Sequence, residues 1–282
     1  MDDRELSIRI TSRMVFLLSP LIPLRGLYLL RTSSIQASLI ALGLASVLLF
    51  PFSFPLSLMP SPRAVFFDMD GVLFDSMPAH AKSWETVAKQ FGFDLPYEEV
   101  FMNEGRTGFS TINMLMQRTH GRDATQQEID DIYEAKCQEF NKFPEAPQMP
   151  GAMELLTKLQ AKGLALYVVT GSGQPSLLER LRLNFPGIFR PERIISSKDV
   201  KHGKPHPEPY LMALDRAGVE ANEAVVVENA PLGVRSARAA GIFTVAVNTG
   251  PLPNIALEAE GANVVLATLH ELCEQWETIV EE

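Results

Sequence analysis

The amino-acid sequence predicts an α/β fold in which helices cover a parallel sheet and a small helical domain is inserted. Two patterns predict this fold. From residue 64 onward, short apolar runs alternate with stretches of helical periodicity, which is typical of strands joined by crossover helices. Between the first two runs lies an insert of roughly seventy residues, far more than a single crossover needs, so we expect a separate structure there.

The elements follow from these patterns in chain order. We expect strands at the apolar runs 64–67, 164–169, 193–195, 224–227, 244–247 and 264–266. Helical periodicity predicts helices near 151–162, 175–184, 207–217, 231–240 and 268–279. Three more helices are expected in the insert, at 79–91, 110–119 and 126–143, the last with Thr125 as N-cap and Glu128 three positions on. We therefore divide this part into a core (63–77 and 149–282) and a helical cap (78–148).

The N-terminal segment, residues 1–62, differs in composition from the rest of the chain. It holds five arginines and no lysine, and carries no charge from residue 32 to residue 62. Residues 35–59 are long enough to cross the ~30 Å hydrocarbon core of a membrane as a helix, whereas three prolines in the second half oppose a continuous helix. Translation beginning at Met59 is the alternative. The sequence leaves a membrane anchor and a misassigned start both open.

Composition excludes some classes of function. The formal net charge of −9 and the pI near 5.2 argue against a nucleic-acid-binding protein, which needs a basic surface to neutralise phosphates. The two cysteines, Cys137 and Cys273, have no partners at metal-ligand spacing, and suggest neither a disulfide framework nor a zinc site. The small number of cysteines fits a cytoplasmic protein. A membrane-anchored protein is the alternative if residues 35–59 span a bilayer.

Acidic residues follow two of the expected strands. Asp68 and Asp70 come directly after the first strand, and Glu228 and Asn229 after the fourth. Ligands of open α/β sheets bind beyond the carboxyl ends of the strands. Two carboxylates this close repel each other unless a cation lies between them, and carboxylate, amide and carbonyl oxygens suit Mg²⁺. The sequence therefore predicts a magnesium site formed by Asp68 and Asp70 with Glu228 or Asn229 from the neighbouring strand.

Groups suited to bind phosphate lie beside this site in the predicted fold. Thr170 supplies a hydroxyl, and the backbone of Gly171 and Ser172 leads into a helix whose N-terminus favours anions. Lys204, in a Gly-Lys-Pro loop, can neutralise both a carboxylate nucleophile and a phosphoryl group. A nucleophile, a metal and phosphate donors are the parts that phosphoryl transfer requires.

Four segments resemble the signature motifs of the haloacid dehalogenase superfamily: FFDMDGVLFDSM, VVTGSG, GKPHPEPY and VVVENAPLG, in this order. The resemblance spans residues 64–282 and is strongest to the β-phosphoglucomutase-like branch, which has a Rossmann-like core and a small helical cap. It implies that Asp68 is the nucleophile and Asp70 the general acid and base, with Thr170 and Lys204 binding phosphate. It also implies a metal site that includes the backbone carbonyl of Asp70.

The resemblance assigns the acidic pair Glu228 and Asn229 to the metal, with one departure. The second residue of the pair is usually aspartate, and the amide at Asn229 removes one negative charge, so we expect weaker metal binding. In the cap, the resemblance places Arg106 in a substrate-specificity loop and His80 near the leaving group.

These observations predict a Mg²⁺-dependent phosphatase that hydrolyses a small phosphorylated metabolite, most plausibly a sugar phosphate, through an aspartyl-phosphate. Two alternatives remain open. A mutase of the β-phosphoglucomutase kind would pass the phosphoryl group to a second hydroxyl of its sugar. A catalytically weak, membrane-tethered binding protein would account for the apolar N-terminus and for Asn229.

Overall fold

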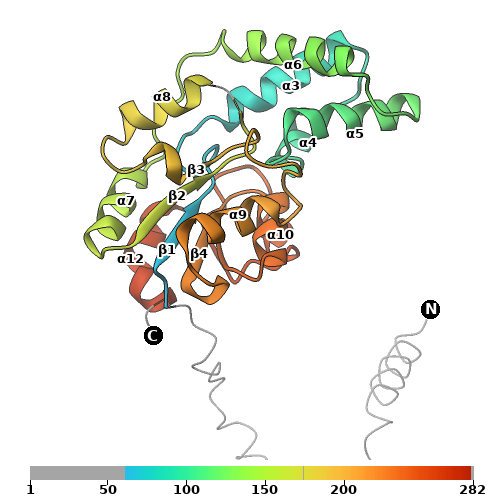
Figure 1. The fold of residues 1–282 in the computed structure, drawn as a ribbon. Helices are drawn as coiled ribbons and strands as arrows, with labels where there is room; N and C mark the ends of the chain where they lie inside the picture. Colours follow the sequence, from blue (N-terminus) through green and yellow to red (C-terminus); the bar gives the residue numbers. More distant parts are fainter. Residues whose placement is uncertain (1–60, 174, 281–282) are drawn as a thin grey trace, which may run out of the picture. The chain divides into compact units, whose positions relative to one another are not determined.

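A computed structural model describes residues 61–173 and 175–280. The core is a parallel sheet of six strands in the order β3-β2-β1-β4-β5-β6 (Figure 1). The strands are β1 (Ala64–Phe67), β2 (Ala165–Val169), β3 (Ile194–Ile195), β4 (Ala224–Glu228), β5 (Phe243–Val247) and β6 (Val264–Leu266). Every hydrogen-bonded pair of neighbours is parallel, which confirms the predicted α/β fold class.

Helices cover both faces of this sheet because side chains along each strand alternate between the two faces. Val65 and Phe67 of β1 pack with α7 (Ala152–Ala161), α8 (Pro175–Asn184) and α12 (Leu269–Val280). Ala64 and Phe66 pack with α9 (Glu208–Ala217) and α10 (Pro231–Ala239) on the opposite face. A one-turn helix, α11 (Ile255–Glu258), and two 3-10 turns, η2 (Pro191–Arg193) and η3 (Ala221–Glu223), complete the core.

The insert between β1 and β2 forms four helices, which we call the cap. They are α3 (Met77–Gln90), α4 (Tyr97–Met102), α5 (Gly108–His120) and α6 (Gln126–Phe140). The cap has its own apolar cluster, which includes Trp84, Phe101 and Ile132. The capping box expected at the start of α6 is present, since Thr125 and Glu128 each bond the other's backbone N–H. The predicted domain limits at residues 78 and 148 stay a prediction.

The main difference from the expected elements is α4, which the sequence patterns did not predict. This helix has only six residues, too few to establish a helical period, and it begins directly after Pro96, whose backbone is extended. Among the described residues, no helix is both long and apolar enough to cross a membrane. The expectations for residues 1–60, including the anchor at 35–59 and a start at Met59, lie outside the described residues.

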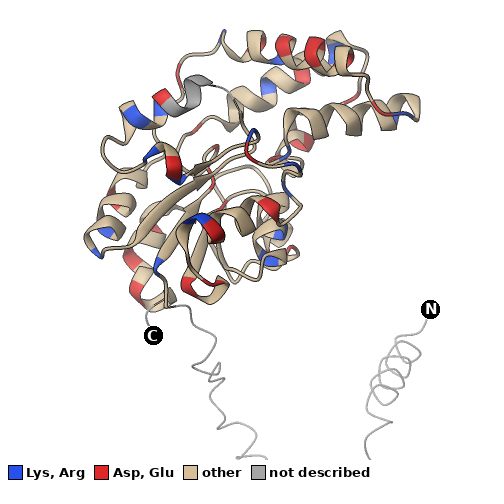
Figure 2. Ribbon diagram, in the orientation of Figure 1, with Lys and Arg blue, Asp and Glu red and all other residues tan. Residues whose placement is uncertain are grey.

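Charged residues are mixed over the described part of the chain. In the view of Figure 2, lysines and arginines lie scattered among acidic residues along the helices and loops, and do not gather on one element.

Candidate active site

The carboxyl ends of three neighbouring strands bring the sequence-predicted residues together. β1 lies between β2 and β4 in the sheet, so Asp68 at the end of β1 has Thr170 on one side and Glu228 and Asn229 on the other. The side chains of Asp68, Thr170 and Asn229 are all buried. The arrangement matches the one expected from strand ends in a parallel sheet.

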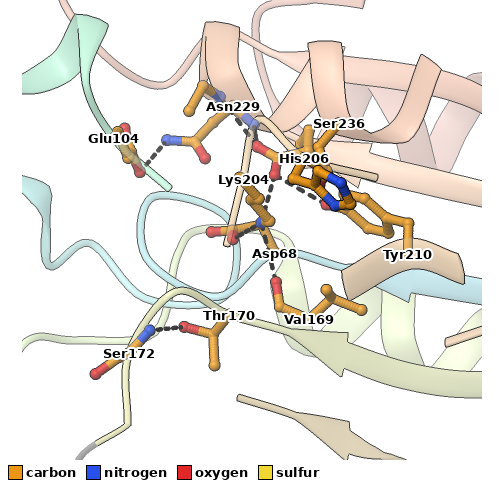
Figure 3. A network of polar contacts seen from close by, with 12 residues as sticks. Asp68, Glu104, Val169, Thr170, Ser172, Lys204, His206, Tyr210, Asn229 and Ser236 are labelled. Atoms are coloured by element: carbon orange, nitrogen blue, oxygen red, sulfur yellow. Dashed lines mark hydrogen bonds and ion pairs between the residues drawn. The ribbon is translucent and has the colours of Figure 1, made fainter. Parts of the chain in front are cut away.

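Lys204 lies at the centre of this group (Figure 3). Its ammonium group pairs with the Asp68 carboxylate, and donates to Glu228 Oε1 at 2.6 Å and to the Val169 carbonyl at 3.0 Å. The residue is only 2% exposed, so its charge is compensated entirely within the protein. The two carboxylates raise the pKa of Lys204 against the opposing effect of burial, so the side chain remains an ammonium.

Glu228 points toward Lys204 and the backbone. Its Oε1 also accepts from the Tyr210 hydroxyl at 2.9 Å, and its Oε2 accepts from the amides of Asn229 and Ala230 at 2.9 and 3.1 Å. Each oxygen of Glu228 therefore has two donors already. Of the two residues predicted as ligands after β4, the geometry favours Asn229 over Glu228 for direct contact with a metal, and both assignments stay predictions.

Asp70 belongs to a second chain of polar contacts that reaches into the cap. Its Oδ1 accepts from the Ser76 hydroxyl at 2.5 Å and lies 3.2 Å from His80 Nε2. His80 Nδ1 lies in turn 2.8 Å from the ammonium nitrogen of Lys136 on α6. Because a lysine ammonium only donates, Nδ1 accepts and Nε2 carries the proton shared with Asp70.

Burial shifts the pKa values of the ionisable side chains in both groups of polar contacts. It raises the pKa of Asp68 to about 7, an effect that Lys204 opposes and Glu228 reinforces. At Asp70 burial is outweighed by His80 and Ser76, which hold the pKa at about 2. Burial lowers the pKa of His80 from its usual value, with Lys136 adding to the decrease, and lowers that of Lys136 to about 8.

The pKa of Lys136 predicts a pH-dependent effect on stability. Because its folded-state pKa of about 8 lies below the ordinary 10.5, its contribution to stability is complete above pH 10.5 and is lost as the pH falls through 8. We therefore expect Lys136→Met to become more stable relative to the wild type as the pH falls over this range, by up to about 3 kcal/mol. Urea unfolding of both proteins at pH 7.5 to 10.5 measures this difference, and a difference independent of pH would contradict it.

The segment after β2, Thr170–Ser172, is predicted to bind phosphate and is called the phosphate-binding segment below. Thr170 Oγ1 accepts from the Ser172 amide at 3.0 Å, which fixes the turn and leaves the hydroxyl proton able to point at a ligand. A Cβ at Gly171 would lie 2.7 Å from the Gly105 carbonyl of the cap, so only glycine allows the cap backbone to come this close. The cap loop therefore lies directly on the phosphate-binding segment.

The two tentative cap residues, His80 and Arg106, both line the cavity between cap and core. The Arg106 guanidinium is half-buried and donates to Asn103 Oδ1 and Ser110 Oγ, each at 3.1 Å. Both contacts are to neutral groups, so the guanidinium keeps a full charge to offer an anion. Its role as a substrate contact stays a prediction.

The cavity has a volume of about 80 Å³ and is small because the cap lies against the core. Asp68, Asp70, Thr170 and Ser172 line it from the core, and Trp84 and Lys136 line it from the cap. The Asp68 carboxylate, the Thr170 hydroxyl and the cap cations Arg106 and Lys136 thus line one cavity.

The oxygen atoms beside Asp68 fit a hard cation. Asn229 Oδ1 is buried and has no hydrogen-bond partner within the described residues, although its Nδ2 donates to Glu104 Oε1 at 2.9 Å (Figure 3). Among the described residues, no group of three His, Cys, Asp or Glu side chains is arranged to hold a metal ion by itself. An orphaned amide oxygen beside two aspartates is the chemistry that Mg²⁺ takes.

Charge supports the same conclusion. Glu104, from the cap loop, is buried close to Asp68, Asp70 and Glu228, and burial together with these carboxylates raises its pKa well above the ordinary value. Lys204 pairs with two of these acids, Asp68 and Glu228, and Lys136 lowers the pKa of a third, Asp70. A divalent cation would relieve the excess negative charge.

Glu104, Lys136 and Ser76 are the site residues that sequence reasoning missed. A signal existed for Lys136, because it falls on the same face of α6 as the buried Ile129 and Ile132. A lysine on an apolar helix face is rarely buried without a partner. Glu104 lies in a loop without any periodic pattern, so only the folded cap shows that it reaches Asn229.

A known family and several known proteins match the part of the chain that holds this site. The family model described as haloacid dehalogenase-like hydrolase matches residues 65–247. The chain is 33% identical over 189 residues to hexitol phosphatase A of Escherichia coli, covering 66% of this chain and 83% of the relative. It is 27% identical over 226 residues to β-phosphoglucomutase of Bacillus subtilis, covering 76% of this chain and 96% of the relative.

A solved structure is also similar to this chain. A Bacteroides vulgatus protein that carries the provisional name β-phosphoglucomutase is 55% identical, with a TM-score of 0.76, and the match covers 79% of this chain and 92% of that one. The resemblance inferred from the four motifs is thereby confirmed. The chain belongs to the haloacid dehalogenase-like hydrolase family, as a phosphoric monoester hydrolase or a phosphoglucomutase-like phosphotransferase.

Proposed function

We propose that this protein is a Mg²⁺-dependent phosphatase that hydrolyses a small phosphorylated metabolite through an aspartyl-phosphate, an acyl phosphate formed on Asp68. The observation that carries the proposal is the buried Asp68 carboxylate, paired with Lys204 and facing the same cavity as Thr170. Lys204 and the donors of the Thr170–Ser172 segment are placed to stabilise the oxygens of a transferring phosphoryl group.

In the first step, an Asp68 oxygen attacks phosphorus while the bond to the leaving oxygen breaks and Asp70 protonates that oxygen. In the second step, Asp70 takes a proton from water, whose oxygen attacks phosphorus and releases phosphate from Asp68. With its pKa held at about 2, Asp70 is ionised at neutral pH and suited to the second step. For the first step it needs a proton, which His80, in contact with it and backed by Lys136, is placed to deliver.

Asp68, Asn229 and the backbone carbonyl of Asp70 would hold the metal, with Glu104 supplying from the cap the negative charge that Asn229 lacks. The ion supplies electrostatic stabilisation of the transferring group. Because the Asp68 carboxylate must be ionised to attack, a cation beside it also favours the reactive form over the protonated one.

This assignment predicts that Glu104→Gln weakens metal binding. The amide preserves the shape and the contact with Asn229 but removes one charge, so we expect the affinity for Mg²⁺ to fall by about tenfold or more. Titration calorimetry with Mg²⁺ alone measures this change independently of activity. Glu98→Gln, an exposed change on the nearby helix α4, serves as the control and should match the wild type. Equal affinity in all three proteins would remove Glu104 from the metal site.

Relatives suggest the class of substrate. Hexitol phosphatase A and a phosphorylated carbohydrates phosphatase are both more than 30% identical to this chain, which favours sugar or polyol phosphates. The small cavity favours compact substrates over large ones. Phosphate release from a panel graded by size, from the smallest phosphate compounds to hexose phosphates, tests this proposal. Absence of Mg²⁺-dependent release across the panel would reject a phosphatase.

A β-phosphoglucomutase activity is the second candidate. It is favoured by the match over 96% of the Bacillus subtilis enzyme and by the contact between His80 and Asp70, which brings a cap residue onto the proposed general acid. Incubation with β-glucose 1-phosphate and a trace of the 1,6-bisphosphate distinguishes the two. Glucose 6-phosphate would indicate a mutase, and free phosphate without the isomer a phosphatase. The enzyme relatives disfavour the third interpretation, a binding protein.

A further inference from the structure

Two linkers join the cap to the core, and they run side by side. The first linker is residues 74–76 and the second is residues 146–149. The Asp75 amide donates to the Pro147 carbonyl at 3.0 Å, and Phe74 pairs with Gln148 as an antiparallel bridge. Any rotation of the cap relative to the core must bend this pair, so groups that hold the pair also restrain the cap.

Arg180, on helix α8, contacts both linkers at once. Its guanidinium lies over the Phe74 ring, 3.9 Å from the centroid, and its Nη2 donates to the Ala146 carbonyl at 3.1 Å. The Glu145 carboxylate lies 3.9 Å from Nε. The Arg180 side chain is only 12% exposed, although within the described residues no carboxylate lies closer to it than that of Glu145. Burying a cation with so little charge compensation is unfavourable. We attribute the burial of Arg180 to its contacts with the two linkers.

A second contact joins the same helix to the second linker. The Gln148 side chain donates to the Asn184 carbonyl at 2.9 Å, and the Asn184 side chain donates to the Arg180 carbonyl at 3.0 Å. Helix α8 follows the phosphate-binding residues Thr170–Ser172 within a few positions of the chain. The linkers are therefore attached to the helix that the phosphate-binding segment leads into.

We propose that Arg180 is a positioning residue that clamps both cap linkers to helix α8 and so keeps the cap closed over the phosphate-binding segment. Substrate that occupies this segment then finds the cap already oriented, and less of its binding energy is used to close it. If the clamp is lost, the closed form of the protein is less populated. The apparent affinity for substrate then falls in proportion to the population of the closed form.

The test compares Arg180→Met, which keeps length but removes the charge and the donors, with Arg180→Lys, which keeps the charge. Arg182→Met is the matched control, because Arg182 lies on the same helix but is exposed and pairs with Glu179 one turn away. Hydrogen–deuterium exchange of the amides in residues 73–78 and 146–150 reports on the linkers without reference to activity.

We expect exchange in these two segments to be about tenfold faster in Arg180→Met, intermediate in Arg180→Lys, and unchanged in Arg182→Met. Exchange in β1 and β4 should remain slow in all proteins, which shows that the core is folded. In the same Arg180→Met protein, KM for a hydrolysed phosphate ester should rise by about three- to tenfold while kcat stays within about twofold.

Unchanged linker exchange in Arg180→Met would overturn the clamp, as would equal acceleration in Arg182→Met. Only the kinetic part rests on the proposed function. If the wild type releases no phosphate from any ester while Arg180→Met still loosens the linkers, the proposed function fails and the clamp stands. If the wild type is active and Arg180→Met alters neither exchange nor KM, the clamp fails and the proposed function stands.

Discussion

Replacing Asp68 with Asn is expected to abolish turnover, with a loss of at least about 10³-fold in kcat. The amide has nearly the shape of the carboxylate but cannot attack phosphorus. Lys204 keeps its bonds to Glu228 and to the Val169 carbonyl, so the fold should survive. Burial and Glu228 disfavour the charge of Asp68, as its pKa of about 7 shows, so the neutral amide should not destabilise the metal-free protein at neutral pH.

Steady-state phosphate release and thermal unfolding, measured on the same samples, test this prediction. Asp75→Asn is the matched control, because Asp75 lies in the same segment but is exposed. A variant at Asp68 that remains folded and retains a tenth or more of wild-type turnover would show that another group attacks phosphorus.

Replacing Lys204 with Met is expected to impair both activity and stability. The ammonium group is the shared partner of Asp68 and Glu228, so its removal leaves two buried carboxylates facing each other. Breaking a buried ion pair in this way costs about 3–5 kcal/mol. Turnover should fall by about 10²-fold or more, because the charge that stabilises the transferring group is also lost.

Urea unfolding with kinetic measurements distinguishes this role from that of an ordinary surface lysine. Lys201→Met, three positions earlier on the same loop and exposed, should change neither the free energy of unfolding nor the turnover appreciably. If Lys204→Met were as stable and as active as Lys201→Met, the central position assigned to Lys204 would be wrong.

The core of the site could be predicted from sequence because it depends on local patterns. Apolar runs mark the strands, parallel strands end at one edge of the sheet, and the residues that follow them meet there. Asp68, Thr170 and Asn229 were found in this way. Lys204 was found from its loop, where glycine and proline on either side shape the backbone around it.

The rest of the site depends on how the cap packs against the core, which no local pattern records. Glu104 reaches Asn229 across 125 positions of the sequence, and Lys136 reaches His80 across 56. The contact of Glu104 with Asn229 is set by the angle between cap and core, whereas the contact of Lys136 with His80 is set by the packing of α6 against α3 within the cap. The orientation of Glu228 toward Lys204 and Tyr210 depends in turn on the packing of α9 against the sheet, which no local pattern records either.

The most direct test of the central claim is chemical trapping of the phosphoenzyme during turnover. The enzyme is mixed with a hydrolysed phosphate ester and Mg²⁺, quenched, reduced with borohydride and digested, and the modified peptide is located by mass spectrometry. Conversion of Asp68 to homoserine is the predicted result, because borohydride reduces an acyl phosphate but not a free carboxylate. Turnover without modification of Asp68, or modification at a different side chain, would contradict covalent catalysis by this residue.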